Sequence, residues 1–172
     1  MRHSHCGYCG TAFPADAGWP RTCPGCGEMM WHNPLPVAVA LQPVRTGDGT
    51  GLVVVRRGIE LGYGKLGMPG GFMEVGESWQ EAMVRELREE TTIVADPASV
   101  RLFDVHSTPT GHTLQVFGLL PVLEPADLPP MIPNDETLEW LVVTEPQDLV
   151  FSTHTQAMAD YFAPARHRPF AP

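Results

Sequence analysis

One segment of this chain, residues 71–93, combines features that few folds can accommodate. It begins with Gly71, carries an isolated Glu77, and continues into the run Arg85–Glu90, which contains three glutamates. Like charges three or four residues apart on a helix repel by a few tenths of a kcal/mol per pair, so these glutamates do not help a helix to fold. A hard divalent cation reverses that sign, because magnesium takes oxygen ligands and keeps phosphates as its remaining partners. The segment therefore predicts a metal-dependent site for phosphate chemistry.

The sequence around the glutamates predicts a helix over residues 79–91. Ser78 is a good N-cap, and Glu81 three residues later completes a capping box. At about 100° per residue, the three glutamates share an arc of roughly 100° on this helix: Glu86, Glu89 and Glu90. We expect them at the boundary between the packed face of the helix and an open cleft.

A glycine-containing loop, Met68–Phe72, precedes the helix. Gly70 and Gly71 allow backbone angles that other residues avoid, so the loop can bring backbone groups close to a metal or a phosphate. Arg85 and Glu77 are expected to pair and hold this loop against the helix. The competing interpretation is a solvated helix with arginine–glutamate pairs one turn apart. The fixed spacing of glycines, isolated glutamate and glutamate triple argues against it.

These residues resemble the Nudix hydrolase signature, which runs Gly, five residues, Glu, seven residues, Arg-Glu-hydrophobic-any-Glu-Glu-any-Gly-hydrophobic. The resemblance extends over roughly residues 36–162 and implies an α/β fold, a Nudix-type α/β/α sandwich with a mixed sheet. It also implies that the three glutamates bind magnesium or manganese, with the Gly70 carbonyl as a further ligand. Glu77 and Arg85 would be their structural and electrostatic partners.

One position departs from that signature, because Thr92 stands where the family has its last glycine. The glycine sits where the helix ends, a position that often needs a left-handed backbone. A β-branched residue is poorly suited to that conformation. Either the helix ends differently in this chain, or the site carries some strain.

All four cysteines lie near the start of the chain, in the pattern Cys6-x2-Cys9-x13-Cys23-x2-Cys26. Two short knuckles of this type bring four thiolates to a tetrahedral zinc ion at about 2.3 Å. Two disulfides, or one histidine in place of a cysteine, are the alternatives. No signal peptide or long apolar run precedes the cysteines, which favours a cytoplasmic chain in which disulfides are rare. A closed shell of four thiolates predicts a structural zinc ion.

The composition of the chain limits the kinds of partner that it is expected to bind. The chain has 172 residues, 43% of them hydrophobic, and a formal net charge of −9. The first 32 residues contain only Arg2 and Arg21 as basic side chains besides histidines, so no nucleic-acid partner is expected. No segment reaches the length of a membrane helix. A small-molecule nucleotide is the expected partner, and the oligomeric state is open, with a homodimer as one arrangement.

The pattern of apolar runs and turn residues divides the chain into a zinc ribbon (1–32), a Nudix domain (36–163) and a poorly ordered tail (164–172). We expect a hairpin loop at 45–49, a proline-rich loop at 124–134 and a final helix at 153–162 capped by Ser152 or Thr153. The expected strands are 37–41, 52–55, 100–107, 113–121 and 137–143.

The resemblance implies hydrolysis of a nucleoside diphosphate linked to another group. Pro109, 16 residues after Ile93, favours ADP-ribose, because ADP-ribose pyrophosphatases carry a proline near that place. A ribbon before the Nudix domain also resembles NADH pyrophosphatases, but their Ser-Gln-Pro-Trp-Pro-Phe-Pro type motif is missing, so NADH and FAD come next. A non-catalytic ADP-ribose sensor with a partner-binding ribbon is the alternative.

Several further residues are candidates for the site. The catalytic base is either a glutamate of the signature or an acidic residue before the last strand, with Glu136 favoured over Glu139 and Asp135. Arg56 is expected to hold a phosphate by bidentate hydrogen bonds, and its neighbour Arg57 shares this prediction. Four aromatic residues could stack on a base, although core packing is the commoner role of such residues: Phe103, His106, Phe117 and Trp140.

Overall fold

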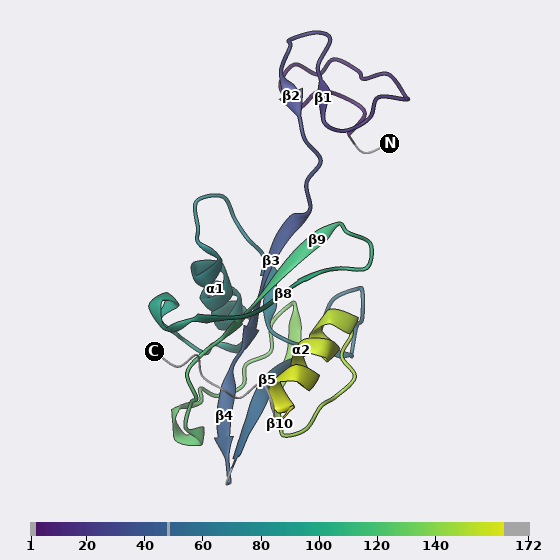
Figure 1. Cartoon of the computed structure of the whole chain (residues 1–172). Helices are drawn as coiled ribbons and strands as arrows, with labels where there is room; N and C mark the ends of the chain where they lie inside the picture. Colours follow the sequence, from purple (N-terminus) through teal and green to yellow (C-terminus); the bar gives the residue numbers. More distant parts are fainter. Residues whose placement is uncertain (1–2, 48, 164–172) are drawn as a thin grey trace. The chain divides into compact units, whose positions relative to one another are not determined.

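The computed structural model describes residues 3–47 and 49–163, and the chain divides into two compact units between Pro34 and Leu35 (Figure 1). The prediction for residues 164–172 lies outside the described part. The smaller unit has one short antiparallel pair of strands, β1 (Arg21–Thr22) and β2 (Met29–Met30). Within the described part of the chain, no helix is long and apolar enough to cross a membrane.

The larger unit is an α/β structure with two four-stranded sheets. One sheet has the strand order β7-β3-β9-β8, in which β3 and β9 are parallel and the other pairs are antiparallel. The second sheet is antiparallel throughout. Its strand order is β10-β5-β4, and β6 also pairs with β5. The strands of the larger unit are β3 (Leu35–Leu41), β4 (Pro43–Thr46), β5 (Gly49–Arg57), β6 (Leu66–Gly67), β7 (Gly70–Phe72), β8 (Arg101–Ser107), β9 (Thr113–Leu119) and β10 (Thr137–Val143). Its helices are α1 (Trp79–Thr91) and α2 (Ser152–Phe162), with short 3-10 turns at Pro97–Ser99 and Pro125–Asp127. The predicted α/β class and mixed sheet are confirmed.

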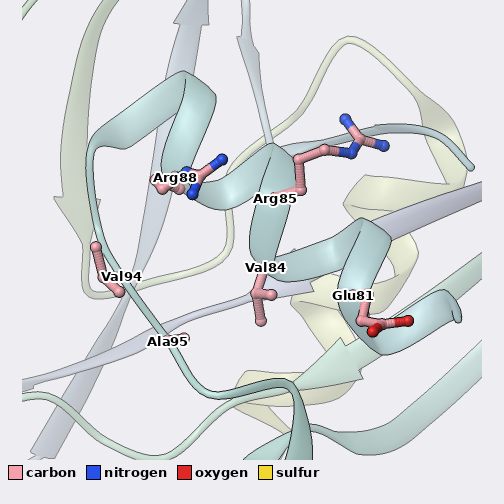
Figure 2. A pocket seen from close by; sticks show the side chains of 6 residues that line it. All are labelled: Glu81, Val84, Arg85, Arg88, Val94 and Ala95. Atoms are coloured by element: carbon pink, nitrogen blue, oxygen red, sulfur yellow. The ribbon is translucent and has the colours of Figure 1, made fainter. Parts of the chain in front are cut away.

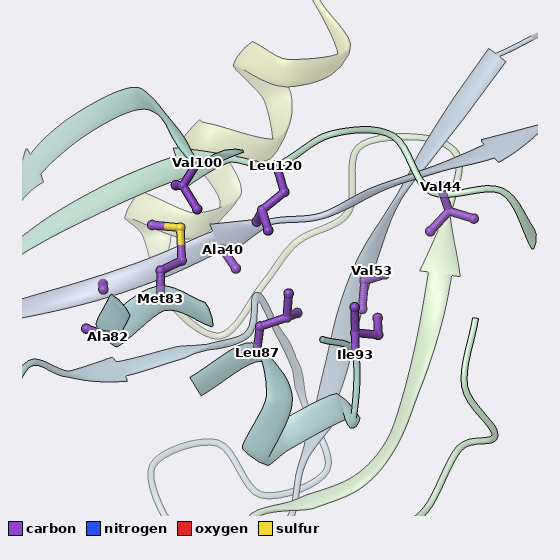
Figure 3. Packing of buried hydrophobic residues seen from close by; sticks show 10 residues of the cluster. Ala40, Val44, Val53, Ala82, Met83, Leu87, Ile93, Val100 and Leu120 are labelled. Carbon is purple, nitrogen blue, oxygen red and sulfur yellow. The ribbon is translucent and has the colours of Figure 1, made fainter. Parts of the chain in front are cut away.

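Residues 38–41 of strand β3 are buried on both faces because a helix covers each side (Figure 1). Ala38 and Ala40 pack in a first cluster with residues of α1, whereas Val39 and Leu41 pack in a second cluster with residues of α2. This alternation follows from the two-residue period of a strand. A run of small and β-branched apolar residues is what a strand covered on both sides requires. Figure 3 shows the first cluster, in which α1 meets the sheet.

Several predicted boundaries can be compared directly with the structure. The helix over 79–91 and the last strand over 137–143 are confirmed to the residue. The hairpin loop at 45–49 was wrong for its first two residues, which belong to β4, and for its last, Gly49, which begins β5. The expected loop at 68–72 contains β7. The predicted cap of the final helix was also wrong: Phe151 is the N-cap, without a side-chain hydrogen bond. The Thr153 hydroxyl is hydrogen-bonded to the Gln115 side chain instead.

Candidate active site

Local sequence fixes the start of α1 and therefore the direction of its glutamates. The Ser78 hydroxyl accepts a hydrogen bond from the Glu81 backbone N–H at 3.3 Å, and the Ser78 backbone N–H donates to the Glu81 carboxylate at 2.7 Å. This is the predicted capping box. The face that packs on the sheet carries the apolar residues Ala82, Met83 and Leu87.

The three glutamates of α1 differ in how deeply they are buried. Glu90 is only 6% exposed, Glu86 is half-buried, and the Glu89 side chain is 53% exposed. The helix thus carries carboxylates from the edge of the core out to solvent. They lie at the border between packed protein and open space, as their arc on the helix predicts.

Strand β7 is shaped around two of these carboxylates. A Cβ atom on Gly71 would overlap the Glu86 carboxylate and force it to move, so glycine allows the carboxylate to lie where it does. The neighbouring Gly70 donates its backbone N–H to Glu90 at 3.2 Å. The glycine pair therefore serves the glutamates by close approach of backbone to carboxylate.

Arg85 ties the helix to the strand before it. Its guanidinium makes two hydrogen bonds to the Glu77 carboxylate, at 2.8 and 3.1 Å, and a third to the Phe72 carbonyl at 3.1 Å. It also contacts Glu86 at 2.7 Å. These hydrogen bonds hold the pKa of the Glu77 carboxyl below its ordinary value, so Glu77 stays charged. The predicted pairing of Arg85 with Glu77 is confirmed.

A cavity of about 910 Å³ opens beside the glutamates. Its lining has a charged part and a part made of apolar and neutral polar side chains. The charged residues include Arg57, Arg85, Glu86, Glu89, Glu90, Asp135 and Glu136. The uncharged part includes Val37, Phe72, Thr113, Gln115, Phe151 and His154. One cavity thus offers a surface for a charged group next to a surface for an uncharged one.

Burial and mutual repulsion raise the free energy of the charged carboxylates when no cation is bound. Burial raises the pKa of Glu90 to about 8, and the charges of Glu86 and Glu136 act in the same direction. The pKa of Glu86 is also raised, mainly by burial, although Arg85 opposes that shift. A bound cation would favour the charged form of both groups.

The loop before β10 is fixed to α1 by one side chain. The Asn134 amide donates to the Glu89 backbone carbonyl at 2.7 Å, and its oxygen accepts the backbone N–H groups of Glu136 and Thr137 at 2.9 and 2.8 Å. These hydrogen bonds hold the loop against the last turn of α1. Glu136 is thereby brought to the same cavity as the helical glutamates.

Not every predicted site residue lies at this cavity. Gly70 and Gly71 line it, together with Arg57, but Arg56 is not among its lining residues and instead pairs with Glu139 at 2.7 Å. Pro109 lies outside the lining as well, in the turn between β8 and β9. That turn reaches the cavity through Thr108 and Thr113.

The aromatic residues of the cavity are not those proposed from sequence. Phe117 is fully buried in the second cluster, and Phe103 and Trp140 pack against the two clusters. His106 lies edge-on to the Phe117 ring. The cavity is lined by two aromatic rings that the sequence interpretation missed, Phe72 and Phe151, and also by Gln115 and His154. A glutamine and a histidine inside otherwise apolar periodic segments were the available signal.

A second hollow, of about 140 Å³, lies against another part of α1 (Figure 2). Its lining combines one carboxylate, two arginines and three small apolar residues: Glu81, Val84, Arg85, Arg88, Val94 and Ala95. It lacks the clustered acidic groups of the larger cavity, so the chemistry points to the larger one.

The four cysteines of the smaller unit form a second cluster of metal-ligand atoms. All four are free thiols, and their Sγ atoms lie within 4.8 Å of one another. Sulfur atoms around a tetrahedral zinc ion at about 2.3 Å are about 3.8 Å apart. The Sγ–Sγ distances of 3.8 Å for Cys6–Cys26 and 3.5 Å for Cys9–Cys23 fit that geometry.

The two cysteine knuckles repeat the same backbone hydrogen bonds. The first cysteine of each knuckle accepts an N–H at its sulfur from two residues later and one at its carbonyl from four residues later, where Gly10 and Gly27 have positive φ. Equivalent turns around equivalent thiols are what a zinc ribbon requires. Among the described residues, only these four bring three or more ligand atoms of this kind so close together.

Comparison with known proteins agrees with the fold and the signature. The model of the NUDIX domain matches residues 34–163. The chain therefore belongs to the NUDIX domain family.

Individual relatives cover less of the chain. The ADP-ribose pyrophosphatase of Methanocaldococcus jannaschii is 34% identical over 90 residues, covering 50% of this chain and 52% of the relative. The NAD-capped RNA hydrolase NudC of Escherichia coli is 29% identical over 92 residues, covering 53% of this chain and 34% of the relative. The chain thus spans about half, or less, of the length of these relatives.

A solved structure covers nearly the whole chain. A NUDIX hydrolase from Nitrosomonas europaea superposes with a TM-score of 0.69 and 25% identity, covering 92% of this chain and 89% of that one. The similarity supports the fold of this chain.

Proposed function

We propose that this protein hydrolyses the pyrophosphate bond of a nucleoside diphosphate linked to another moiety, with magnesium or manganese bound by Glu86, Glu89 and Glu90. The observation that carries the proposal is the single cavity into which these glutamates, Glu136 and Arg57 all project. A cavity lined by these four carboxylates and by others, such as Asp135, repels an anionic substrate unless cations intervene.

The donor set fits hard divalent cations. All candidate ligand atoms are oxygens, and the raised pKa values of Glu86 and Glu90 mark carboxylates that a cation would stabilise. Gly71 leaves space for the Glu86 carboxylate, and the Gly70 backbone lies against Glu90. When bound, such ions neutralise the pyrophosphate and make a water more acidic.

The protein's own residues then orient the substrate and move the proton. Arg57, which lines the cavity, would hold a phosphate oxygen, a role that the sequence had assigned to Arg56 and Arg57 together. Glu136 is the favoured general base, because Asn134 fixes its loop against α1 and directs it to the cavity. Glu77 and Arg85 hold β7 in place beside the glutamates.

ADP-ribose is the favoured substrate, with FAD and NADH next. Support comes from the name of the archaeal relative, an ADP-ribose pyrophosphatase, and from a cavity that offers an uncharged surface beside the charged one. The bacterial relative is named for NAD-capped RNA, so a nucleotide at the end of a longer chain belongs in the same test. The cysteine cluster is proposed to bind one structural zinc ion.

Hydrolysis of a substrate panel tests the proposal. The panel holds ADP-ribose, NADH, NAD, FAD, diadenosine polyphosphates, nucleoside triphosphates and NAD-capped RNA, each with magnesium or manganese, and the phosphorylated products are separated and quantified by chromatography. We expect one substrate to be turned over well above the rest, and its turnover to be lost in Glu89→Gln. No turnover of any compound, combined with tight ADP-ribose binding, would contradict the proposal and indicate a sensor.

A further inference from the structure

Three cavity-lining side chains form a row across one sheet. Val37 of β3 is paired with Phe72 of β7 on one side and with Gln115 of β9 on the other. Directly paired residues of neighbouring strands point to the same face of a sheet. Val37 packs against the second core cluster, so this face is the one that α2 covers. The row gives the cavity a floor that changes from an aromatic ring to an amide.

This floor lies next to the glutamate site. Strand β7 carries Gly71 against Glu86 of α1, and the following residue, Phe72, belongs to the row on the opposite face. The cavity therefore passes around the edge of the sheet at β7. A molecule whose pyrophosphate meets the glutamates can extend its other end over the row.

The amide in this row is buried and held from α2. Gln115 is 5% exposed, and its amide contacts the Thr153 hydroxyl and Nε2 of His154, the latter at 3.3 Å. A buried glutamine is retained where its hydrogen bonds are satisfied or where a ligand completes them. Counting the hydrogen bonds of the Gln115 amide therefore shows whether one of its N–H groups is free to bind a ligand.

His154 fixes the direction of that amide. Nδ1 of His154 accepts the backbone N–H of Met68 at 3.3 Å, so Nδ1 carries no hydrogen. Burial lowers the pKa of His154 to about 3, and the charge of Arg57 acts in the same direction, so the ring is neutral with its hydrogen on Nε2. Nε2 is consequently a donor, and Gln115 must present its amide oxygen to it.

The amide NH2 group then lies on the side of Thr153, whose hydroxyl accepts one of its hydrogens. This orientation turns the amide by 180° from the one in which Thr153 donates to it. Within residues 3–47 and 49–163, no other side chain or backbone group is hydrogen-bonded to the Gln115 amide. Because Gln115 lines the cavity, its second N–H can be taken by an acceptor on a bound molecule.

We propose that the nucleobase of the substrate lies on the floor formed by Phe72 and Val37, with the Gln115 amide donating a hydrogen bond to an acceptor on the edge of the base. Phe72 is 57% exposed although it lines a cavity, which suits a ring waiting for a stacking partner. The ligand class is a planar nitrogen heterocycle, and adenine offers three ring acceptors for this contact. The inference deepens the proposed function and rests on it for the identity of the ligand.

Binding of nucleosides tests this base site without metal, phosphate or hydrolysis. Adenosine and its 1-deaza, 3-deaza and 7-deaza analogues are titrated into the native chain, and NMR follows the side-chain NH2 signals of Gln115. We expect adenosine to shift these signals, and one of the three analogues to bind about tenfold more weakly because it lacks the acceptor. Equal affinity of adenosine and all three analogues would overturn the inference.

A matched pair of variants supplies the second arm. Gln115→Met is compared with Gln42→Met, because Gln42 is also buried but donates to the Pro43 and Pro121 carbonyls and does not line the cavity. We expect Gln115→Met to weaken adenosine binding about tenfold and to remove the preference among the analogues, with Gln42→Met close to the native chain. Equal effects of the two variants would overturn the inference. Selective adenosine binding without hydrolysis of any panel compound would overturn the proposed function and leave the base site supported.

Discussion

The two units differ in where their proposed metal-ligand residues lie. In the described part of the smaller unit, residues 3–34, the only buried side chains are two of the cysteines, Cys6 and Cys23. The larger unit has two apolar clusters, and its glutamates lie beside them at the edge of a cavity. In the smaller unit the buried interior consists of proposed ligand residues. In the larger unit the apolar core is separate from the proposed ligand residues.

This difference separates folding from chemistry. A unit of about thirty residues cannot bury enough apolar surface to fold alone, and metal binding can supply the missing free energy. A unit with two packed clusters can instead keep clustered carboxylates that repel each other. Loss of metal should therefore unfold the smaller unit and silence the larger one.

The largest effect is expected from zinc removal. Structural zinc contributes about 10–16 kcal/mol to folding in small zinc domains, so chelation should unfold the smaller unit completely. Elemental analysis should find one zinc per chain before chelation. Amide NMR signals of residues 3–34 should then collapse, while those of the larger unit keep their dispersion. A zinc-free chain with a folded smaller unit would remove the contrast between the units.

A much smaller structural effect is expected when a glutamate of the site is neutralised. Glu89→Gln should lower turnover at least about a hundredfold, because a metal ligand contributes several kcal/mol to transition-state stabilisation. Its side chain is 53% exposed and contacts Arg85 only at 3.4 Å, so the midpoint of thermal unfolding should change little. Steady-state kinetics and calorimetry on the same preparation measure both. Near-normal activity would exclude Glu89 from the metal site.

The two regions also differ in how much of them could be predicted from sequence. Spacing alone was enough for the cysteine knuckles and for α1, because the Ser78–Glu81 capping box and the position of the glutamates depend on neighbours a few residues away. The uncharged side of the cavity could not be predicted in this way. It joins Phe72, Gln115 and His154 from β7, β9 and α2, and only strand register brings them together.

Two wrong or displaced assignments have the same physical origin. Thr153 was expected to cap α2, but a tertiary hydrogen bond to Gln115 uses its hydroxyl. Arg56 and Arg57 follow each other in β5, so they point to opposite sides of the strand. Sequence could not tell which side faces the cavity. Local patterns predict elements, whereas the choice between equivalent side chains depends on contacts that are distant in the chain.

Acid should act on the larger unit through His154, the one buried histidine among its residues that the structure describes. The native pKa of about 3 lies below the value near 6.5 of an unfolded histidine, so the unfolded chain binds the extra proton between these values. The contribution is fully present above pH 6.5 and is lost as the pH falls toward 3. Between pH 7 and pH 5 the native chain should lose about 2 kcal/mol more than His154→Asn.

Urea unfolding at pH 5, 6, 7 and 8 measures that difference, with hydrogen exchange of β5 amides reporting the larger unit alone. This probe is needed because acid also protonates zinc-bound thiolates and destabilises the smaller unit. Parallel pH profiles for the native chain and His154→Asn would show that His154 does not titrate as its burial predicts.

The smallest expected effect concerns the end of α1, where Thr92 replaces the glycine of the family signature. The helix ends as the signature predicts, because Thr92 adopts the left-handed conformation with φ 63° and ψ 3° and donates its N–H to the Arg88 carbonyl at 2.8 Å. A left-handed backbone costs a residue with a Cβ about 1–2 kcal/mol, and a glycine would avoid this cost. Glycine also raises the conformational entropy of the unfolded chain, which offsets part of the gain in stability. Thr92→Gly should therefore raise the free energy of unfolding by about 0.5–1 kcal/mol. Thr92→Ala is the control, since it keeps the Cβ and should not show this gain. If Thr92→Gly is instead destabilised, the 2.6 Å hydrogen bond from the Thr92 hydroxyl to the Thr91 carbonyl outweighs the backbone strain, and the departure from the signature is itself a stabilising feature.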